Sequence, residues 1–175
     1  MKPINPSRVV ILYTLNERKE KPMATQGDNS KKALVSELNG LLADHFALYT
    51  KTKNFHWHVK GPRFRDLHLL FDEHAIAIRD NIDIIGERVR KNDAPTLTSL
   101  GSIAAATQIE DQDKTGLKAE DMVQELHDDN VKLLARIKKL KELTEKTGDN
   151  ATDGILDDIT DQVEERIWFL KSTLR

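Results

Sequence analysis

Apolar residues at three- and four-residue spacing dominate this sequence from Lys31 onward, and this spacing restricts the chain to long amphipathic helices. In the first such stretch, residues 31–58, Leu34, Leu38 and Leu41 repeat with this period. The same period returns in three further stretches, at about 66–91, 119–146 and 152–174. No stretch alternates between apolar and polar residues as a half-buried strand does. The pattern therefore predicts an all-α protein.

Helix-breaking residues separate these stretches. Gly61-Pro62 ends the first helix, Asp66 is expected to cap the second, residues 92–95 end it, and Gly148 stops the third. A short alanine-rich helix is expected over 98–107, within the long connection between the second and third helices. Four long helices with such a connection indicate a four-helix bundle with ferritin-like topology over residues 31–175.

The first 30 residues lack this helical period, so we expect a flexible N-terminal tail over 1–30. Within it, residues 1–22 hold five basic and two acidic side chains, a net charge of +3, which leaves −5 for residues 23–175. Met23 follows the sequence ERKEKP, which purine-rich codons of a ribosome-binding site can encode. We therefore interpret residues 1–22 as a possible extension preceding a natural start at Met23.

Composition restricts both the cellular compartment of the protein and the kind of metal site that it can form. The chain has no cysteine, which excludes disulfides and thiolate metal sites. Its longest apolar run, residues 9–15, is far shorter than the roughly 20 residues of a membrane span. No small-residue cleavage site follows that run, as it would in a signal peptide. We therefore predict a cytoplasmic protein.

Metal-ligating residue types gather on one face of the second helix. At about 100° per residue, His68, Asp72, Asp83 and Glu87 lie at roughly 0°, 40°, 60° and 100° around its axis. The Gly61-Pro62 reversal would bring His56 alongside His68. Two imidazoles and three carboxylates suit iron, manganese or zinc.

Distance along the helix prevents a single chain from completing this site. Asp72 and Asp83 are eleven residues apart, about 16 Å along the axis, whereas metal–ligand bonds are about 2 Å long. The second half of the chain offers one histidine, His127, and no Glu-x-x-His motif. We therefore predict an antiparallel second copy of this helix, in a twofold homodimer with two equal metal sites across its interface.

The stretches HWHVKGPRFRDLHLLFDEH and DNIDIIGER, together with GDNATDGILDDI and ERIWFLKS, resemble the Dps family of mini-ferritins. The resemblance covers about 31–175. It implies a ferroxidase centre that oxidises Fe(II), preferably with hydrogen peroxide, and a hollow twelve-subunit shell that stores the ferric mineral and limits oxidative damage. By this resemblance, one subunit supplies His56, His68 and Asp72, and its twofold partner supplies Asp83 and Glu87.

Other residues have roles that the resemblance suggests less directly. Trp57 is either an electron donor that intercepts radicals or an interface packing residue. His58 either contacts metal or faces solvent, and His74 is a candidate to assist a weaker second iron. The resemblance also implies an acidic threefold pore with Glu145, Asp149 and Asp153 as candidates, although Asn150 and Gly154 stand where relatives often have acids. His45 and His127 are expected to be structural, and Trp168 is expected in the core.

The sequence leaves two other functions open. One is a nucleoid-compacting DNA-binding protein in which iron chemistry is secondary. DNA-binding relatives use basic tails, and attraction to phosphate is electrostatic. A chain that starts at Met23 keeps Lys31 and Lys32 against Asp28, so we expect weak DNA binding for that form. The other alternative is a bundle whose interface metal, for instance zinc, is structural.

Overall fold

The computed structural model describes residues 26–174, and all regular structure in that part of the chain is helical. The helices are α1 (Gln26–His58), α2 (Phe64–Lys91), α3 (Leu100–Ala106), α4 (Ala119–Thr147) and α5 (Asn150–Thr173). The predicted all-α class, with four long helices and one short helix, is confirmed. Among these helices, none is long and apolar enough to cross a membrane.

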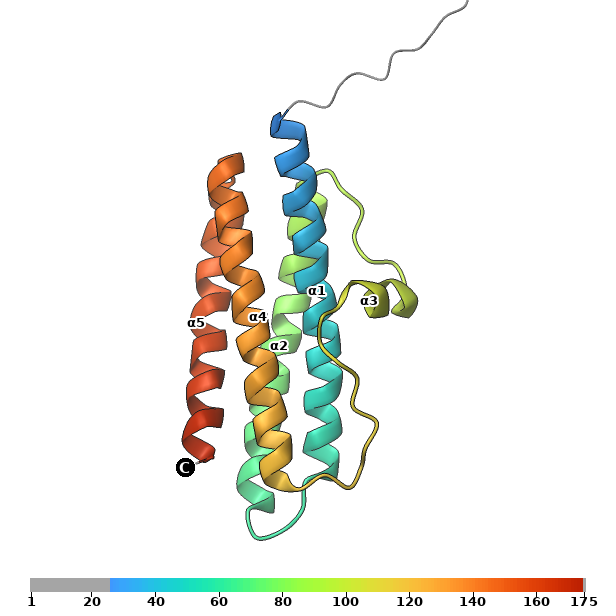
Figure 1. The fold of residues 1–175 in the computed structure, drawn as a ribbon, viewed down its shortest axis with the longest axis vertical. Coiled ribbons are helices and arrows are strands. Elements are labelled where there is room, and N and C mark those ends of the chain that lie inside the picture. The colour runs from blue at the N-terminus through green and yellow to red at the C-terminus, as the bar shows by residue number, and fades with distance from the viewer. Residues whose placement is uncertain (1–25, 175) are drawn as a thin grey trace, which may run out of the picture.

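The four long helices form two antiparallel hairpins that pack side by side (Figure 1). α1 and α2 make one hairpin, and α4 and α5 make the other. The connection from α2 to α4 runs back along the whole bundle and carries α3 against the outside of α1 (Figure 1). This connection gives the bundle the ferritin-like topology that the sequence predicts.

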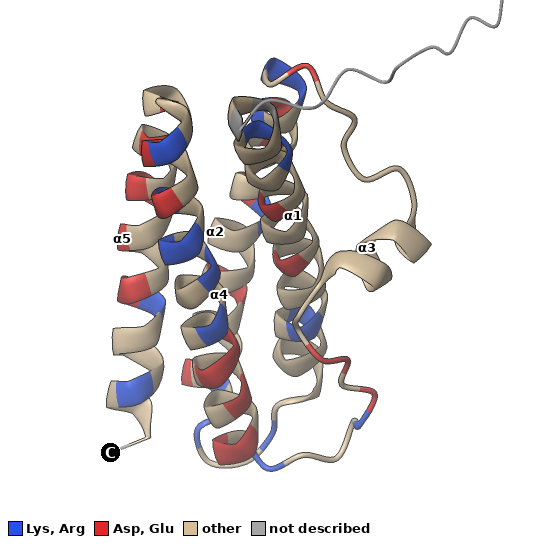
Figure 2. Cartoon of the chain, turned by 45° about the horizontal axis from the view of Figure 1, so that its top comes forward, with Lys and Arg blue, Asp and Glu red and all other residues tan. Residues whose placement is uncertain are grey.

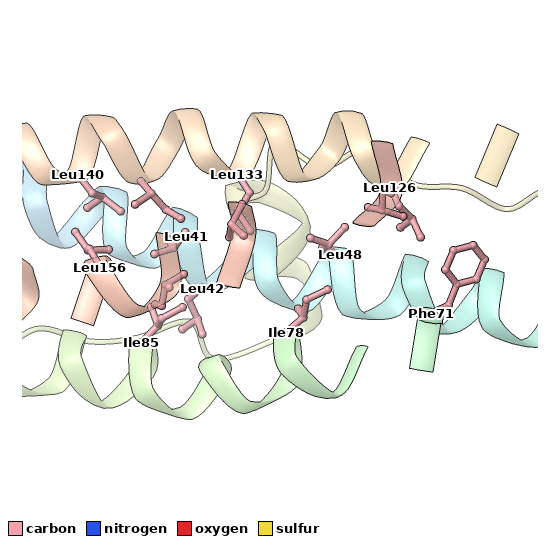
Figure 3. Packing of buried hydrophobic residues seen from close by; sticks show 14 of the residues in the cluster. Leu41, Leu42, Leu48, Phe71, Ile78, Ile85, Leu126, Leu133, Leu140 and Leu156 are labelled. Atoms are coloured by element: carbon pink, nitrogen blue, oxygen red, sulfur yellow. The ribbon is translucent and has the colours of Figure 1, made fainter. Parts of the chain in front are cut away.

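The core lies along the bundle axis and takes apolar side chains from each long helix (Figure 3). Leu41 of α1, Ile78 of α2, Leu133 of α4 and Leu156 of α5 are 0–1% exposed. Each such side chain contributes roughly 1.5–3 kcal/mol by leaving water. The apolar period of the sequence therefore places its residues in the core as predicted.

Trp168 departs from this pattern. The sequence predicts Trp168 in the core, but the structure leaves it 64% exposed, with its ring edge-on to the neighbouring Phe169. The core position on this turn of α5 belongs instead to Arg166, which is 2% exposed. The buried position is therefore held by a charged side chain and not by the large aromatic one. The apolar period of the sequence does not predict this exchange.

Helix boundaries differ from the predictions by a few residues. α1 begins at Gln26, so residues 26–30 of the predicted tail belong to this helix, and residues 1–25 lie outside the described chain. α2 begins at Phe64, and Asp66 lies in its first turn rather than capping it. Gly148 ends α4 with a left-handed φ of 67°, as expected for a C-cap glycine.

Candidate metal centre

The turn between α1 and α2 brings His56 and His68 face to face. Gly61 has a φ of 107°, which favours glycine, and it lets the chain reverse between the two helices. The two imidazole rings stack with centroids 3.8 Å apart and planes 19° from parallel. Phe64, in the first turn of α2, lies 5.1 Å from the His68 ring and covers it. The predicted pairing of these histidines is therefore present within one chain.

Each of these histidines donates a hydrogen bond to the backbone of the other. His56 Nδ1 is 2.8 Å from the carbonyl oxygen of His68, and His68 Nδ1 is 2.8 Å from that of His56. Since a carbonyl can only accept, both Nδ1 atoms carry the proton. In the neutral rings, both Nε2 atoms then keep a lone pair for a metal ion.

Asp72 lies one helical turn after His68 and faces the same place. Its Oδ1 is 3.9 Å from His56 Nε2. It also accepts a 2.8 Å hydrogen bond from Lys53 Nζ, and this bond holds the pKa of the Asp72 carboxyl below its usual range. One imidazole nitrogen, that of His56, thus lies near an ionised carboxylate at this end of the α1–α2 hairpin, and the His68 ring stacks on the His56 ring.

Lys53 is a residue of this site that the sequence reasoning missed. Its ammonium contacts Asp72 and lies 5.7 Å from the centre of the Trp57 ring. The available signal was its position on α1, three residues before His56 and four before Trp57, which places all three on neighbouring faces. Lys53 therefore forms an ion pair with the Asp72 carboxylate, which is the group that a metal ion would bind.

The remaining predicted ligands lie at the far end of α2. Asp83 and Glu87 are exposed, and both line a shallow pocket of about 340 Å³ with Phe46 and Leu97. Glu87 accepts a 2.8 Å hydrogen bond from Lys91, which lowers the pKa of its carboxyl. Within residues 26–174, no three histidine or acidic side chains come close enough to hold a metal together. A single chain therefore presents two separate parts of the predicted ligand set.

Exposed apolar side chains share the α2 face that carries these ligands. Leu69, Ile76 and Ile84 are 44%, 44% and 46% exposed. Around the helix axis they lie at roughly 100°, 80° and 160° from His68, so the first two fall within the 0–100° sector of the four predicted α2 ligands and the third lies next to it. We call these three residues the α2 apolar stripe.

The other histidines take different positions. His58 is half-buried and its Nδ1 donates to the carbonyl of Asn54. His74 is buried on the opposite side of α2, with its ring edge-on to Phe169 of α5, so it lies away from His56 and His68. His45 is fully buried and bonds the Leu41 carbonyl, and His127 lies against Asp128.

The three pore candidates differ in how many hydrogen bonds and ion pairs their carboxylates form. Asp149 caps α5 and accepts hydrogen bonds from Arg88 and Thr152. Asp153 accepts hydrogen bonds or ion pairs from Lys141 and Thr144. Glu145 is exposed. Asp149 thus has a structural role that the sequence reasoning did not assign to it.

Comparison with known proteins gives consistent matches. A family model for the ferritin-like domain matches residues 35–175. A Bacillus anthracis relative, DNA protection during starvation protein 2, is 32% identical over 143 residues, which cover 82% of this chain and 97% of the relative. The crystal structure of a Dps protein from Bacillus brevis has a TM-score of 0.81 at 29% identity and covers 87% of this chain and 100% of that one.

A further solved structure comes from Vibrio cholerae. It is described as a Dps protein and a member of a broad superfamily of ferritin-like diiron-carboxylate proteins. Its TM-score is 0.80 at 27% identity, over 89% of this chain and 100% of that one. Since the family model and these relatives each cover most of the chain, and the bundle has their fold, this protein belongs to the Dps family of ferritin-like proteins.

Proposed function

We propose that this protein is a ferroxidase that oxidises Fe(II) at sites shared between two subunits and stores the ferric product inside a hollow shell. The observation that carries the proposal is the stacked His56–His68 pair, whose Nε2 lone pairs are free and whose His56 Nε2 lies 3.9 Å from the ionised carboxylate of Asp72. Imidazole nitrogens hold ferrous ions, and carboxylates stabilise the ferric product. Such a set favours oxidation over static metal binding.

The proposed second half of each site comes from a twofold-related subunit. Asp83 and Glu87 share an α2 face with His68 and Asp72, and the α2 apolar stripe on that face needs a partner surface. An antiparallel α2 from a second copy would cover the stripe and bring the carboxylates to the histidines. A twofold contact of this kind repeats itself and yields two equal sites.

The proposed oxidant is hydrogen peroxide. Two Fe(II) ions each give one electron to one peroxide, whose O–O bond breaks to form two water molecules after protons are taken up. Because both electrons are transferred at one centre, no hydroxyl radical is released. Trp57, 65% exposed beside Lys53 and next to His56 in the chain, is the proposed electron donor for radicals that do form.

The full proposed assembly is a cytoplasmic twelve-subunit shell, which rests on the family resemblance. DNA protection would then come from removing iron and peroxide. For the chain starting at Met23 we expect weak or no DNA binding at physiological salt, because its net charge is −5. Lysines and arginines are interspersed with acids over the bundle rather than gathered on one face in the view of Figure 2. A gel shift with tight binding at such salt would contradict this.

A mixing experiment tests the shared site. We expect His68→Ala shells and Asp83→Ala/Glu87→Ala shells each to lose most Fe(II) oxidation, measured by absorbance with peroxide and, separately, with oxygen. Shells reassembled from equal amounts of both chains should recover about a quarter of the wild-type sites, since half of the random dimers keep one intact site.

The matched control is Glu142→Ala, which removes an exposed carboxylate from α4, a helix outside the proposed α2 interface. It should oxidise iron at the wild-type rate. Mixed shells that native mass spectrometry shows to have formed, but that recover no activity, would rule out shared sites. Wild-type shells that bind zinc but do not oxidise iron would favour the structural-metal alternative.

A further inference from the structure

A buried arginine lies inside the bundle with most of its hydrogen-bonding capacity unused. Arg166 of α5 is 2% exposed, and its Nε donates a 2.9 Å hydrogen bond to Asn130 Oδ1 of α4. Its Nη1 and Nη2 are buried and have no hydrogen-bond partner among the described residues. No carboxylate of residues 26–174 lies within 4.0 Å of it. The guanidinium is therefore a buried charge that forms no direct ion pair within the described residues.

This charge persists at neutral pH. Burial lowers the pKa of Arg166 to about 10, and the nearby Glu165 carboxylate opposes that shift, so the side chain stays protonated at pH 7. A buried ion that lacks a partner costs several kcal/mol. A group from outside the chain that accepts hydrogen bonds from Nη1 and Nη2 would offset this cost.

A small pocket lies beside this guanidinium, in the groove between α2 and α5. It has a volume of about 140 Å³ and is lined by Arg166, His74, Gln162 and Phe169, with Glu73 and Glu165 among its remaining residues. The volume holds a few groups the size of a water molecule, each taking up roughly 30 Å³. The pocket therefore has room for a small ion.

The donors around the pocket favour a negative ligand. His74 is buried and lines the pocket, and an imidazole ring offers at least one N–H donor. Gln162 Oε1 accepts a 2.8 Å hydrogen bond from Asn81, which leaves its amide NH₂ as a donor. Glu73 and Glu165 are exposed and disfavour ions of higher charge.

We propose that this pocket binds a small monovalent anion, such as chloride, between α2 and α5 against the Arg166 guanidinium. The ion would accept hydrogen bonds from Nη1 and Nη2, from His74 and from the Gln162 amide. It would neutralise the buried charge and join α2 to α5, two helices that otherwise share few contacts. The site is separate from the His56–His68 pair, which lies on the other face of α2.

Chloride-35 NMR of the assembled protein tests this site. Purified shells are prepared in gluconate, a bulky organic anion, and chloride is added at constant ionic strength. We expect wild-type shells to broaden the chloride line, and Arg166→Met to reduce the broadening at least fivefold. Lys171→Met, which removes an exposed cation from the same helix, should broaden the line as wild type does.

A crystal grown with bromide locates the ion independently of any variant. We expect an anomalous peak at hydrogen-bond distance from the Arg166 Nη atoms. If Arg166→Met does not assemble, Gln162→Leu takes its place in the NMR comparison and should weaken chloride binding several-fold. Equal broadening by wild type and variant, or water in place of bromide, would overturn the proposal. A bromide peak without broadening in solution would show an adventitious ion only, and would overturn it as well.

Discussion

His56 and His68 each donate a hydrogen bond from Nδ1 to the backbone carbonyl of the other, at 2.8 Å in both directions. This reciprocal pair closes the end of the α1–α2 hairpin and fixes both rings with Nε2 pointing away from the backbone. The same bonds that hold the turn together thus select the tautomer that binds metal. The end of the α1–α2 hairpin and the proposed metal binding therefore both depend on these two hydrogen bonds.

The Lys53–Asp72 contact predicts an effect on metal affinity. Replacing Lys53 with methionine removes the cation that occupies Asp72 and competes with a metal ion. Because the pair is partly exposed, we expect Co(II), a spectroscopic substitute for Fe(II), to bind about twofold to fivefold more tightly. Lys60→Met, an exposed lysine at the same end of the bundle, is the control. Unchanged Co(II) affinity in Lys53→Met would show that the contact does not compete with metal.

The α2 apolar stripe predicts where the dimer forms. Ile76→Asp places a charge in the middle of the stripe, so it should dissociate the twofold dimer and abolish iron oxidation while leaving helicity intact. Light scattering and an iron oxidation assay measure the two effects. Val131→Asp, an equally exposed apolar residue on α4, should keep the twofold dimer. Intact dimers of Ile76→Asp would contradict the proposed interface.

Asp149 predicts a pH-dependent loss of stability. Burial alone would raise the pKa of its carboxyl, but hydrogen bonds from Arg88 and Thr152 outweigh burial and hold it well below its usual range. The stabilisation is therefore complete above the unfolded pKa of about 4 and is lost as the pH falls toward the folded value. Asp149→Asn should lower the free energy of unfolding by about 2–4 kcal/mol at pH 7.

This difference between wild type and Asp149→Asn should shrink between pH 5 and pH 3 in denaturant titrations. Asp157→Asn is the control, because that carboxylate is exposed and pairs only with Lys141. A difference that stays constant down to pH 3 would mean that the Arg88 contact does not depend on the Asp149 charge.

Substitution of Gly148 is expected to change stability through backbone strain alone, without a steric clash. Its φ is 67°, and a Cβ added there would meet no atom within 4 Å. Gly148→Ala should therefore cost about 1 kcal/mol through backbone strain alone. Gly148→Asn should cost less, because asparagine tolerates the left-handed region. Thermal unfolding of both variants measures the effect, and equal losses would point to a different cause.

The apolar period carried enough information to predict the bundle. Leu41, Ile78 and Leu133 are buried as their spacing predicts. The apolar face of an amphipathic helix is stable only when it packs against other helices and leaves water. The turn at Gly61 and the stop at Gly148 followed from the conformations that glycine permits. Helix starts were less accurate, since Phe64 begins α2 without a side-chain cap.

The sequence by itself determined the bundle, the pairing of His56 with His68 and the separation of Asp83 from them, since all three follow from helix period and length. Tertiary structure decided the rest. It placed Lys53 on Asp72, turned His74 toward Phe169, exposed Trp168 and buried Arg166. These contacts and exposures depend on which side chains of neighbouring helices meet across the bundle. The apolar period along one helix does not specify the side chains of its neighbours.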